Sequence, residues 1–292
     1  MKPRAKDNIN NSFTFKALGT EFIILTPTEL SAVQKNSILK YVENFETDYS
    51  RFRKDSKLSK LNISKKLDNP SLEMQKMLKF AVKTWETSGG LFNISIGGVL
   101  ESQGYGQIND KASTISKNLA KDIFISPQKI EINPNIWLDF GGFGKGWFID
   151  KLSDLLVEWN FKDYIINGGG DIRVGSQQVK IELENPLNSD ESIGAVLLKN
   201  QAFGASSNLK RTWKSANNKS YSHIQRPDGE KLKNNILMTA TISDTALRAD
   251  VLATCLLLDT GSKNIAELKT WGDYCFILKD LRVFRTANFH LV

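Results

Sequence analysis

The segment DFGGFGKGWFID, residues 139–150, combines an acid, several glycines and a lysine just before an amphipathic run. Glycines let a backbone approach a ligand closely, or adopt dihedral angles that side chains forbid. Backbone N–H groups at a helix start, together with Lys145, could therefore bind phosphate oxygens. The spacing matches neither the P-loop nor the dinucleotide-binding fingerprint. The segment could therefore form a phosphate site, or only a tight strand-to-helix turn with an exposed Lys145.

The segment LRADVLATCLLL, residues 247–258, places a carboxylate among apolar residues. Asp250 and Thr254 are four residues apart, so they share one face of a predicted helix. A carboxylate in such surroundings needs a partner. The partner is either a hydrogen-bond donor, such as Thr254 or nearby backbone, or a hard cation such as Mg²⁺, which carboxylate and hydroxyl oxygens bind.

Two further segments contain residues that could do chemistry. His223, one of two histidines in the chain, lies in SHIQRPDGE at residues 222–230, just before a Pro-Asp-Gly turn signal. Histidine is the usual proton acceptor near neutral pH, so His223 is either a general base or an ordinary packed or surface residue. In NGGGDIRVG, residues 167–175, the glycines before Asp171 indicate either close backbone packing or a ligand contact.

The elements that position these segments follow from hydrophobic periodicity and turn signals. The predicted helices cover residues 29–44, 72–87, 146–159, 244–258 and 264–271. The predicted strands cover residues 20–26, 163–167, 178–184, 195–199, 274–278 and 282–285. Strands in hairpin-like runs, with helices between the clusters, predict an α+β fold with mixed or antiparallel sheets and packed helices.

Composition excludes several classes of protein. The chain has 292 residues, of which 40% are hydrophobic and 24% charged, which is typical of a globular protein. No apolar stretch approaches the roughly 18 to 20 residues that span a bilayer. Two cysteines are too few for a disulfide framework or a zinc cluster. The net charge of +7 is spread thinly, without the basic stripe of a nucleic-acid-binding protein.

Seven segments in a fixed order carry a family resemblance. They are ALGTEF (17–22), DYSRFRKDSKLSKLN (48–62), SGGLFNISIGGVL (88–100), DFGGFGKGWFID (139–150), INGGGDI (166–172), SHIQRP (222–227) and ATISDTALRADVLAT (240–254). This series resembles the FAD:protein FMN transferases, the ApbE family, over nearly the whole chain. The resemblance implies an ApbE-like fold, with a single flavin transferase domain at residues 13–286 after a polar N-terminal segment at residues 1–12.

The resemblance also implies roles for the residues of the glycine-rich and Asp-Thr segments. Asp139 would contact the flavin nucleotide, and the backbone carbonyl of Gly142 would bind Mg²⁺. Lys145 would reach the phosphates of the ligand. Asp250 and Thr254 would be the side-chain metal ligands.

Further implied residues line the FAD site or do chemistry there. His223 is the family's candidate base. The implied FAD-contacting residues are Leu18, Phe52, Leu91, Phe92, Asn93 and Ile224.

The chain departs from the usual family pattern at several positions. These are Asn93 for Asp, Ser95 for Thr, Gly98 for Pro, Phe52 for Tyr, and Ser206-Ser207 for Ser-Gly. The metal pair and Lys145 match the pattern, so the resemblance implies an intact site. Because Asn93 lacks the carboxylate usual in the family, the resemblance leaves open whether transfer reaches the family's full efficiency.

The activity implied is Mg²⁺-dependent transfer of FMN from FAD to a Ser or Thr hydroxyl of a partner flavoprotein, with release of AMP. Lys145 and His223 would be the catalytic side chains. The alternatives are a pyrophosphatase that splits FAD into FMN and AMP, and a non-catalytic flavin carrier. We expect FAD and the acceptor flavoprotein as partners, with no nucleic acid and no membrane span. The first residues contain no apolar leader, so we expect a cytoplasmic protein, whereas many relatives are exported or anchored lipoproteins.

Overall fold

The computed structural model describes residues 2–4, 9–106, 113–209, 212–214, 218, 220–230, 232, 235–259 and 263–292. At its centre is an eight-stranded sheet in the order β16-β15-β14-β11-β8-β7-β3-β2, with antiparallel neighbours throughout. Its strands are β2 (Asn11–Ala17), β3 (Thr20–Thr26), β7 (Ile165–Gly168), β8 (Asp171–Val174), β11 (Ala202–Ser207), β14 (Ile236–Ser243), β15 (Gly272–Leu278) and β16 (Val283–Arg285). The α+β prediction is therefore confirmed.

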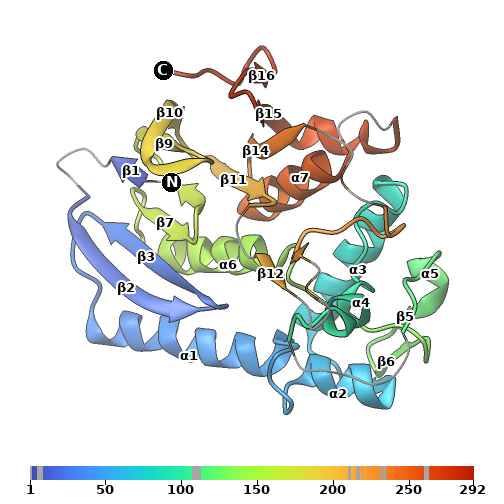
Figure 1. Ribbon diagram of the computed structural model, residues 1–292. Helices are drawn as coiled ribbons and strands as arrows, with labels where there is room; N and C mark the ends of the chain where they lie inside the picture. Colours follow the sequence, from blue (N-terminus) through green and yellow to red (C-terminus); the bar gives the residue numbers. More distant parts are fainter. Residues whose placement is uncertain are drawn as a thin grey trace.

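Helices cover one face of this sheet (Figure 1). Those that pack directly on its strands are α1 (Ala32–Tyr49), α6 (Gly144–Glu158) and α7 (Ala246–Leu258). The other α-helices of the described residues are α2 (Lys57–Ser64), α3 (Leu72–Thr87), α4 (Gly97–Ser102) and α5 (Leu119–Asp122). None of these helices, within the described residues, combines the length and the apolarity that crossing a bilayer requires.

The opposite face is covered by a second sheet, formed by β1 (Lys2–Arg4), β9 (Val179–Asn185) and β10 (Asn188–Leu198). Neighbouring residues of the central strands divide between the two faces because side chains alternate along a strand. Ile166 and Ala202 pack with the helices, whereas Ile165 and Phe203 pack with β9 and β10. Figure 1 shows α1 in blue along the bottom and the yellow β9–β10 pair near the top.

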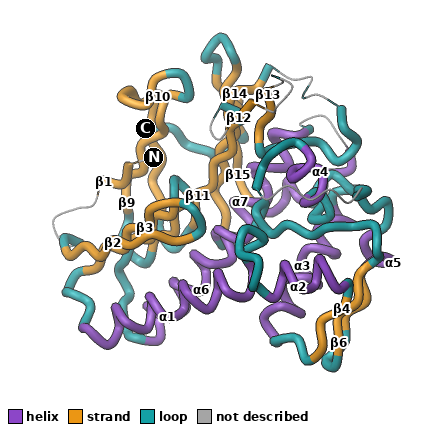
Figure 2. The backbone as a smooth tube through the Cα atoms, turned by 60° about the horizontal axis from the view of Figure 1, so that its bottom comes forward, coloured by secondary structure: helices purple, strands orange, loops and turns teal. Residues whose placement is uncertain are grey.

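Smaller elements gather at one side of the molecule. In Figure 2, α2, α3 and α4 lie there together with β4 (Lys66–Asp68) and β6 (Lys129–Ile132), which pairs with β5 (Ile123–Ile125). A separate two-stranded hairpin is formed by β12 (Thr212–Lys214) and β13 (Ser220–Ser222). This hairpin leads directly into His223.

Most predicted elements overlap observed ones, but four strands of the central sheet, β2, β8, β11 and β14, had no prediction. Two predicted helices also differ from the observed structure. The first helix begins later than predicted, at Ala32, because Ser31 and Gln34 form a capping box there. The predicted helix at 264–271 is wrong: Lys263–Ile265 and Leu268–Trp271 form two short 3₁₀ turns instead. Turns of three or four residues are too short to nucleate an α-helix.

Candidate active site

A pocket of about 700 Å³ opens between the helical layer and the ends of the central strands. Such a volume is within the range of sites that hold small molecules and cofactors. The pocket is lined by every residue that the sequence singled out for a site: Leu18, Phe52, Leu91, Phe92, Asn93, Asp139, Gly142, Lys145, His223, Ile224, Asp250 and Thr254. The fold thus brings together residues up to 236 positions apart in the chain (254 minus 18).

Lys145 lies in the first turn of α6 and points between two acids. Its Nζ forms an ion pair with Asp171 Oδ2 and lies 4.0 Å from Asp250 Oδ2. The Lys145 side chain is 19% exposed, and the carboxylates of Asp171 and Asp250 are buried. The interpretation of a turn with an exposed Lys145 is therefore wrong. Two carboxylates and one lysine therefore lie together at this end of the pocket.

Asp250 and Thr254 lie on successive turns of α7 and face the same pocket. Asp250 Oδ2 accepts a hydrogen bond of 3.1 Å from the backbone N–H of Gly146. Thr254 Oγ1 lies 3.0 Å from Ser206 Oγ on β11. An N–H group at the start of α6, which the sequence had suggested for a phosphate, is thus bonded to a carboxylate instead.

Close packing of α6 on α7 makes this arrangement possible. A Cβ atom at Gly146 would lie 2.6 Å from the carbonyl oxygen of Ala246. At Gly204 on β11, a Cβ would lie 2.6 Å from the carbonyl carbon of Ala249. Only glycine permits these approaches, so two glycines place α7, and with it Asp250, against α6 and the sheet.

Residues with oxygen atoms that a hard cation could use line this pocket. Asp250 offers a carboxylate, Thr254 a hydroxyl and Gly142 its backbone. Mg²⁺ prefers oxygen ligands, few of them from protein side chains, and usually keeps water or phosphate oxygens as well. Among the described residues no group of three or more His, Cys, Asp or Glu side chains could hold a metal ion. Asp250 and Thr254 are nevertheless oxygen donors of the kind that Mg²⁺ prefers, and they lie one helical turn apart on α7.

Asp139 is held by an arginine that sequence reasoning missed. Arg51 Nε lies 3.1 Å from Asp139 Oδ2, and Asp139 Oδ1 accepts a 2.8 Å hydrogen bond from the N–H of Gly141. The guanidinium of Arg51 lies 4.3 Å from the ring centroid of Phe52, and its side chain is 2% exposed. Its position next to Phe52 in the sequence was the available signal. Arg51 thus connects the acid and the aromatic ring on one pocket wall.

Asn93 is used in a local network that a carboxylate could not form. Its Nδ2 donates a 2.9 Å hydrogen bond to the carbonyl of Ser116, and its Oδ1 accepts from the hydroxyl and the N–H of Ser95. The Ser95 hydroxyl in turn accepts from the N–H of Ser116. Asn93 and Ser95, two of the departures from the family pattern, therefore belong to one hydrogen-bond network that ties the segment at Ser116 to the pocket wall.

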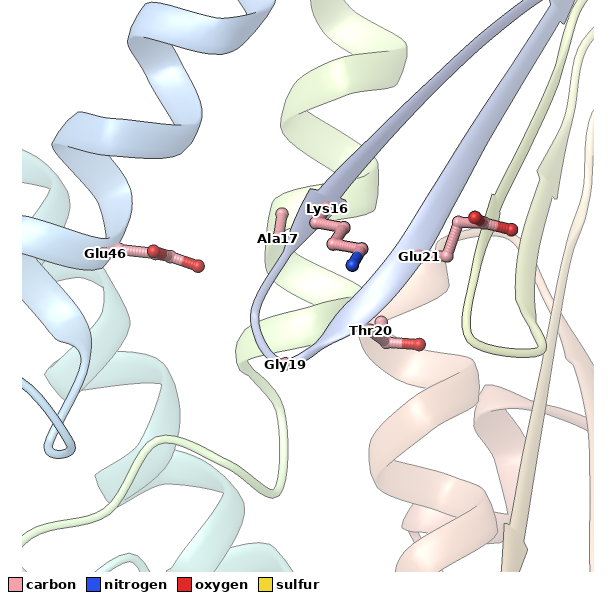
Figure 3. A pocket seen from close by; sticks show the side chains of 6 residues that line it. All are labelled: Lys16, Ala17, Gly19, Thr20, Glu21 and Glu46. Carbon is pink, nitrogen blue, oxygen red and sulfur yellow. The ribbon is translucent and has the colours of Figure 1, made fainter.

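Leu18 lies at the tight β2–β3 turn, where Leu18 and Gly19 both have positive φ (51° and 72°). The N–H of Leu18 donates a 2.8 Å hydrogen bond to Glu46 Oε1 on α1. Figure 3 shows the Glu46 side chain reaching from α1 toward this turn, across a small hollow that shares Gly19 and Glu46 with the large pocket. Glu46, also missed from the sequence, holds the turn at the pocket edge.

His223 and Ile224 form another wall, directly after β13. His223 is half-buried, and Ile224 is buried against Leu257 and Leu258 of α7. Asp171 and Ser206 complete the list of site residues that the sequence did not assign: both were quoted in motifs, but neither was given a role. Their contacts with Lys145 and Thr254 depend on the sheet, which local sequence does not specify.

Comparison with solved structures shows to which class of fold the protein belongs. The fold superposes on an ApbE protein from Thermotoga maritima with a TM-score of 0.82 at 19% identity, covering 95% of this chain and 97% of the other. It superposes on the flavin transferase ApbE from Vibrio cholerae with a TM-score of 0.76 at 19% identity and the same coverage. The fold is that of the ApbE flavin transferases.

Sequence comparison then gives the family. The model of the ApbE family matches residues 18–272, and the chain belongs to this family. Curated relatives named FAD:protein FMN transferase include one from Haemophilus influenzae, 22% identical, covering 92% of this chain and 87% of the relative. Another, from Buchnera aphidicola, is 25% identical and covers 93% of this chain and 86% of the relative.

Proposed function

We propose that this protein is a Mg²⁺-dependent FAD:protein FMN transferase, which moves FMN from FAD to a Ser or Thr hydroxyl of a partner flavoprotein and releases AMP. The observation that carries the proposal is that Lys145, Asp250, Thr254 and His223 line one pocket, together with aromatic and apolar side chains such as Phe52 and Phe92. Family membership and the names of the curated relatives support it.

The reaction is a substitution at phosphorus. The acceptor hydroxyl oxygen bonds to the FMN-side phosphorus of FAD, the bond from that phosphorus to the bridging oxygen breaks, and AMP leaves with that oxygen. His223 takes the proton of the hydroxyl. Lys145 stabilises the phosphate charge, and Asp171 holds its Nζ in place. Phosphoryl transfer needs mainly alignment and charge neutralisation, which this site can supply.

Asp250, Thr254 and the carbonyl of Gly142 would hold the Mg²⁺ ion. When bound, the ion neutralises charge on the pyrophosphate oxygens. The remaining walls bind and orient the flavin: Phe52 offers a ring face at the mouth, where its side chain is 49% exposed, and Asp139 is fixed for a polar contact by Arg51.

One incubation tests the proposal against its alternatives. The protein is mixed with FAD, Mg²⁺ and a peptide that bears a candidate acceptor threonine, and the products are weighed by mass spectrometry. A peptide heavier by one FMN unit, with an equal amount of AMP, is the expected result. Free FMN and AMP without peptide modification would indicate a pyrophosphatase, and unchanged FAD would indicate a carrier. Replacing threonine by alanine in the peptide, or removing Mg²⁺ with EDTA, should abolish the mass gain.

A further inference from the structure

The hairpin that precedes His223 lies outside the main sheets. Strands β12 and β13 pair only with each other among the described strands, with Trp213 opposite Tyr221. A two-stranded hairpin by itself is at best marginally stable in water. Contacts with the rest of the protein must therefore fix its position, and with it the position of His223.

Trp213 makes the principal contact. Its ring stacks on Tyr105 with centroids 4.6 Å apart and planes at 20°, and its Nε1 donates a 2.7 Å hydrogen bond to the carbonyl of Gln103. On its hairpin side it stacks on Tyr221, at 6.2 Å and 25°. Figure 1 shows β12 near α4, whose end leads into Gln103 and Tyr105.

A second contact, made by a residue that follows His223 in the chain, reaches the same residues after α4. Gln225 Nε2 donates a hydrogen bond to Gln103 Oε1. His223 is therefore bracketed by two attachments, at Trp213 and at Gln225, to the residues that follow α4. Both the stack and the amide contact would have to break for the histidine to leave the pocket wall.

The segment that receives these contacts is itself tied to the pocket. Arg51 Nη1 donates a 3.0 Å hydrogen bond to the carbonyl of Tyr105, and the guanidinium lies 5.2 Å from the Tyr105 ring centroid. The same arginine pairs with Asp139 and packs on Phe52. The support of the hairpin is thus rigidly connected to the wall where the flavin is proposed to bind.

We propose that Trp213 is a positioning residue for transfer, which holds His223 at the pocket by stacking on Tyr105. The proposal rests on the proposed function, in which His223 accepts the proton of the acceptor hydroxyl. It assigns to Trp213 no contact with FAD, since Trp213 does not line the pocket. Its loss should therefore lower kcat while leaving KM for FAD nearly unchanged.

Three substitutions test this role. Trp213→Leu removes the stack and the N–H donor, and Trp213→Phe keeps an aromatic ring. Phe284→Leu is the matched control, an exposed aromatic residue on β16 at the far edge of the sheet. We expect Trp213→Leu to lower kcat about 3- to 10-fold, the size that loss of one aromatic pair allows. Trp213→Phe should recover most of this loss, and Phe284→Leu should transfer like the wild type.

A double-mutant cycle with His223→Asn identifies the residue through which Trp213 acts. If Trp213 acts through His223, adding Trp213→Leu to His223→Asn should not lower kcat further. Hydrogen exchange gives a readout without turnover: the amides of residues 220–225 should exchange faster in Trp213→Leu. Two results would overturn the role of Trp213 and leave the proposed function intact. One is additive losses of kcat in the cycle, and the other is wild-type amide exchange together with wild-type kcat in Trp213→Leu. Absence of transfer by the wild type would overturn the proposed function, and the role of Trp213 in it.

Discussion

At the scale of the residue, Asp250 connects the parts of the site. It lies on α7, accepts a hydrogen bond from Gly146 at the start of α6, and faces the Nζ of Lys145. Its carboxylate thus makes a structural hydrogen bond and also lies close to a charged side chain. The two contributions can be separated, because asparagine keeps an oxygen that can accept the Gly146 hydrogen bond but removes the charge.

We therefore predict that Asp250→Asn folds normally and loses Mg²⁺-dependent FMN transfer. Removing the charged ligand should cost at least about 10- to 100-fold, the range already found for losses around metal ligands. The measurement is the transfer rate as a function of Mg²⁺ concentration. Asp154→Asn, at an exposed acid on α6, is the control and should behave as wild type. Wild-type transfer by Asp250→Asn at low Mg²⁺ would exclude Asp250 as a ligand.

A second prediction at this scale concerns His223. As general base it should be protonated at low pH, so transfer should fall below about pH 6.5, the ordinary histidine pKa. His223→Asn should remove this acidic limb and lower kcat about 10²- to 10⁴-fold with FAD affinity retained. His290→Asn changes the other histidine, which is exposed near the C-terminus, and should have no effect. A loss below about fivefold would make His223 a packing residue, and an equal loss of FAD binding would make it a ligand contact.

At the scale of the element, the approach of α6 to α7 sets the geometry of the end of the pocket where Lys145 and Asp250 lie. Gly146 has no room for a side chain, because its Cβ would lie 2.6 Å from the Ala246 carbonyl oxygen. Gly144, two residues earlier in the same helix, would meet nothing closer than 4.0 Å. Alanine substitutions at these two positions can therefore distinguish the effect of close backbone packing from the effect of helix propensity.

We predict that Gly146→Ala destabilises the protein by about 1 to 3 kcal/mol, the usual cost of overpacking. Gly144→Ala should change stability little, because alanine fits there and favours the helix. Denaturant unfolding of both variants measures the difference. Equal stability of the two variants would show that α6 and α7 can separate without cost.

Both cysteines are buried within elements that pack on the central sheet. Cys255 lies on α7, and Cys275 lies on β15, where burial raises the pKa of its thiol to about 12. Burial also raises the pKa of Cys255. Because the unfolded chain releases these protons at lower pH than the folded one, the thiols favour unfolding increasingly as the pH rises above about 8.5.

We therefore predict that neither thiol reacts rapidly with a disulfide reagent at pH 8.5 in the folded protein. Both should react within seconds after denaturation, when the ordinary thiol pKa returns. Counting released chromophore in the two states is the measurement. Rapid reaction of a native thiol would mean that α7 or β15 opens readily.

At the scale of the whole molecule, the central sheet separates two cores. The helical core contains the elements that carry Lys145 and Asp250, whereas the core under β9 and β10 lies on the opposite face. The C-terminal segment closes this second core with Phe289, which is fully buried, and Val292 exchanges two backbone hydrogen bonds with Ala195 on β10. The far layer thus supports the sheet whose strand ends form the site.

We predict that Phe289→Ala lowers the free energy of unfolding by about 3 to 5 kcal/mol, as for other buried aromatic residues. Remaining folded protein should keep its KM for FAD, because Phe289 does not line the pocket. Thermal unfolding and FAD titration measure the two effects. A changed KM at wild-type stability would contradict the separation of the two cores.

The sequence by itself determined the α+β class of the fold and predicted which residues form the site. Apolar periodicity placed β3 and α3 at their observed bounds, because local patterning is strong where one face of an element is buried. It did not find β2, β8, β11 or β14. Of these, β14 is buried at every position and therefore lacks alternation. The order of motifs gave the family and, through it, twelve residues that line one pocket.

Only the tertiary structure decided how these residues meet. Arg51 with Asp139, Asp171 with Lys145, and Ser206 with Thr254 are pairs from distant segments, and their side chains meet because the sheet order and two close glycine contacts bring those segments together. The structure also showed that Asn93 needs its amide to hold Ser116. Local sequence specifies which groups are available, whereas their distances depend on packing between elements, which no single segment encodes.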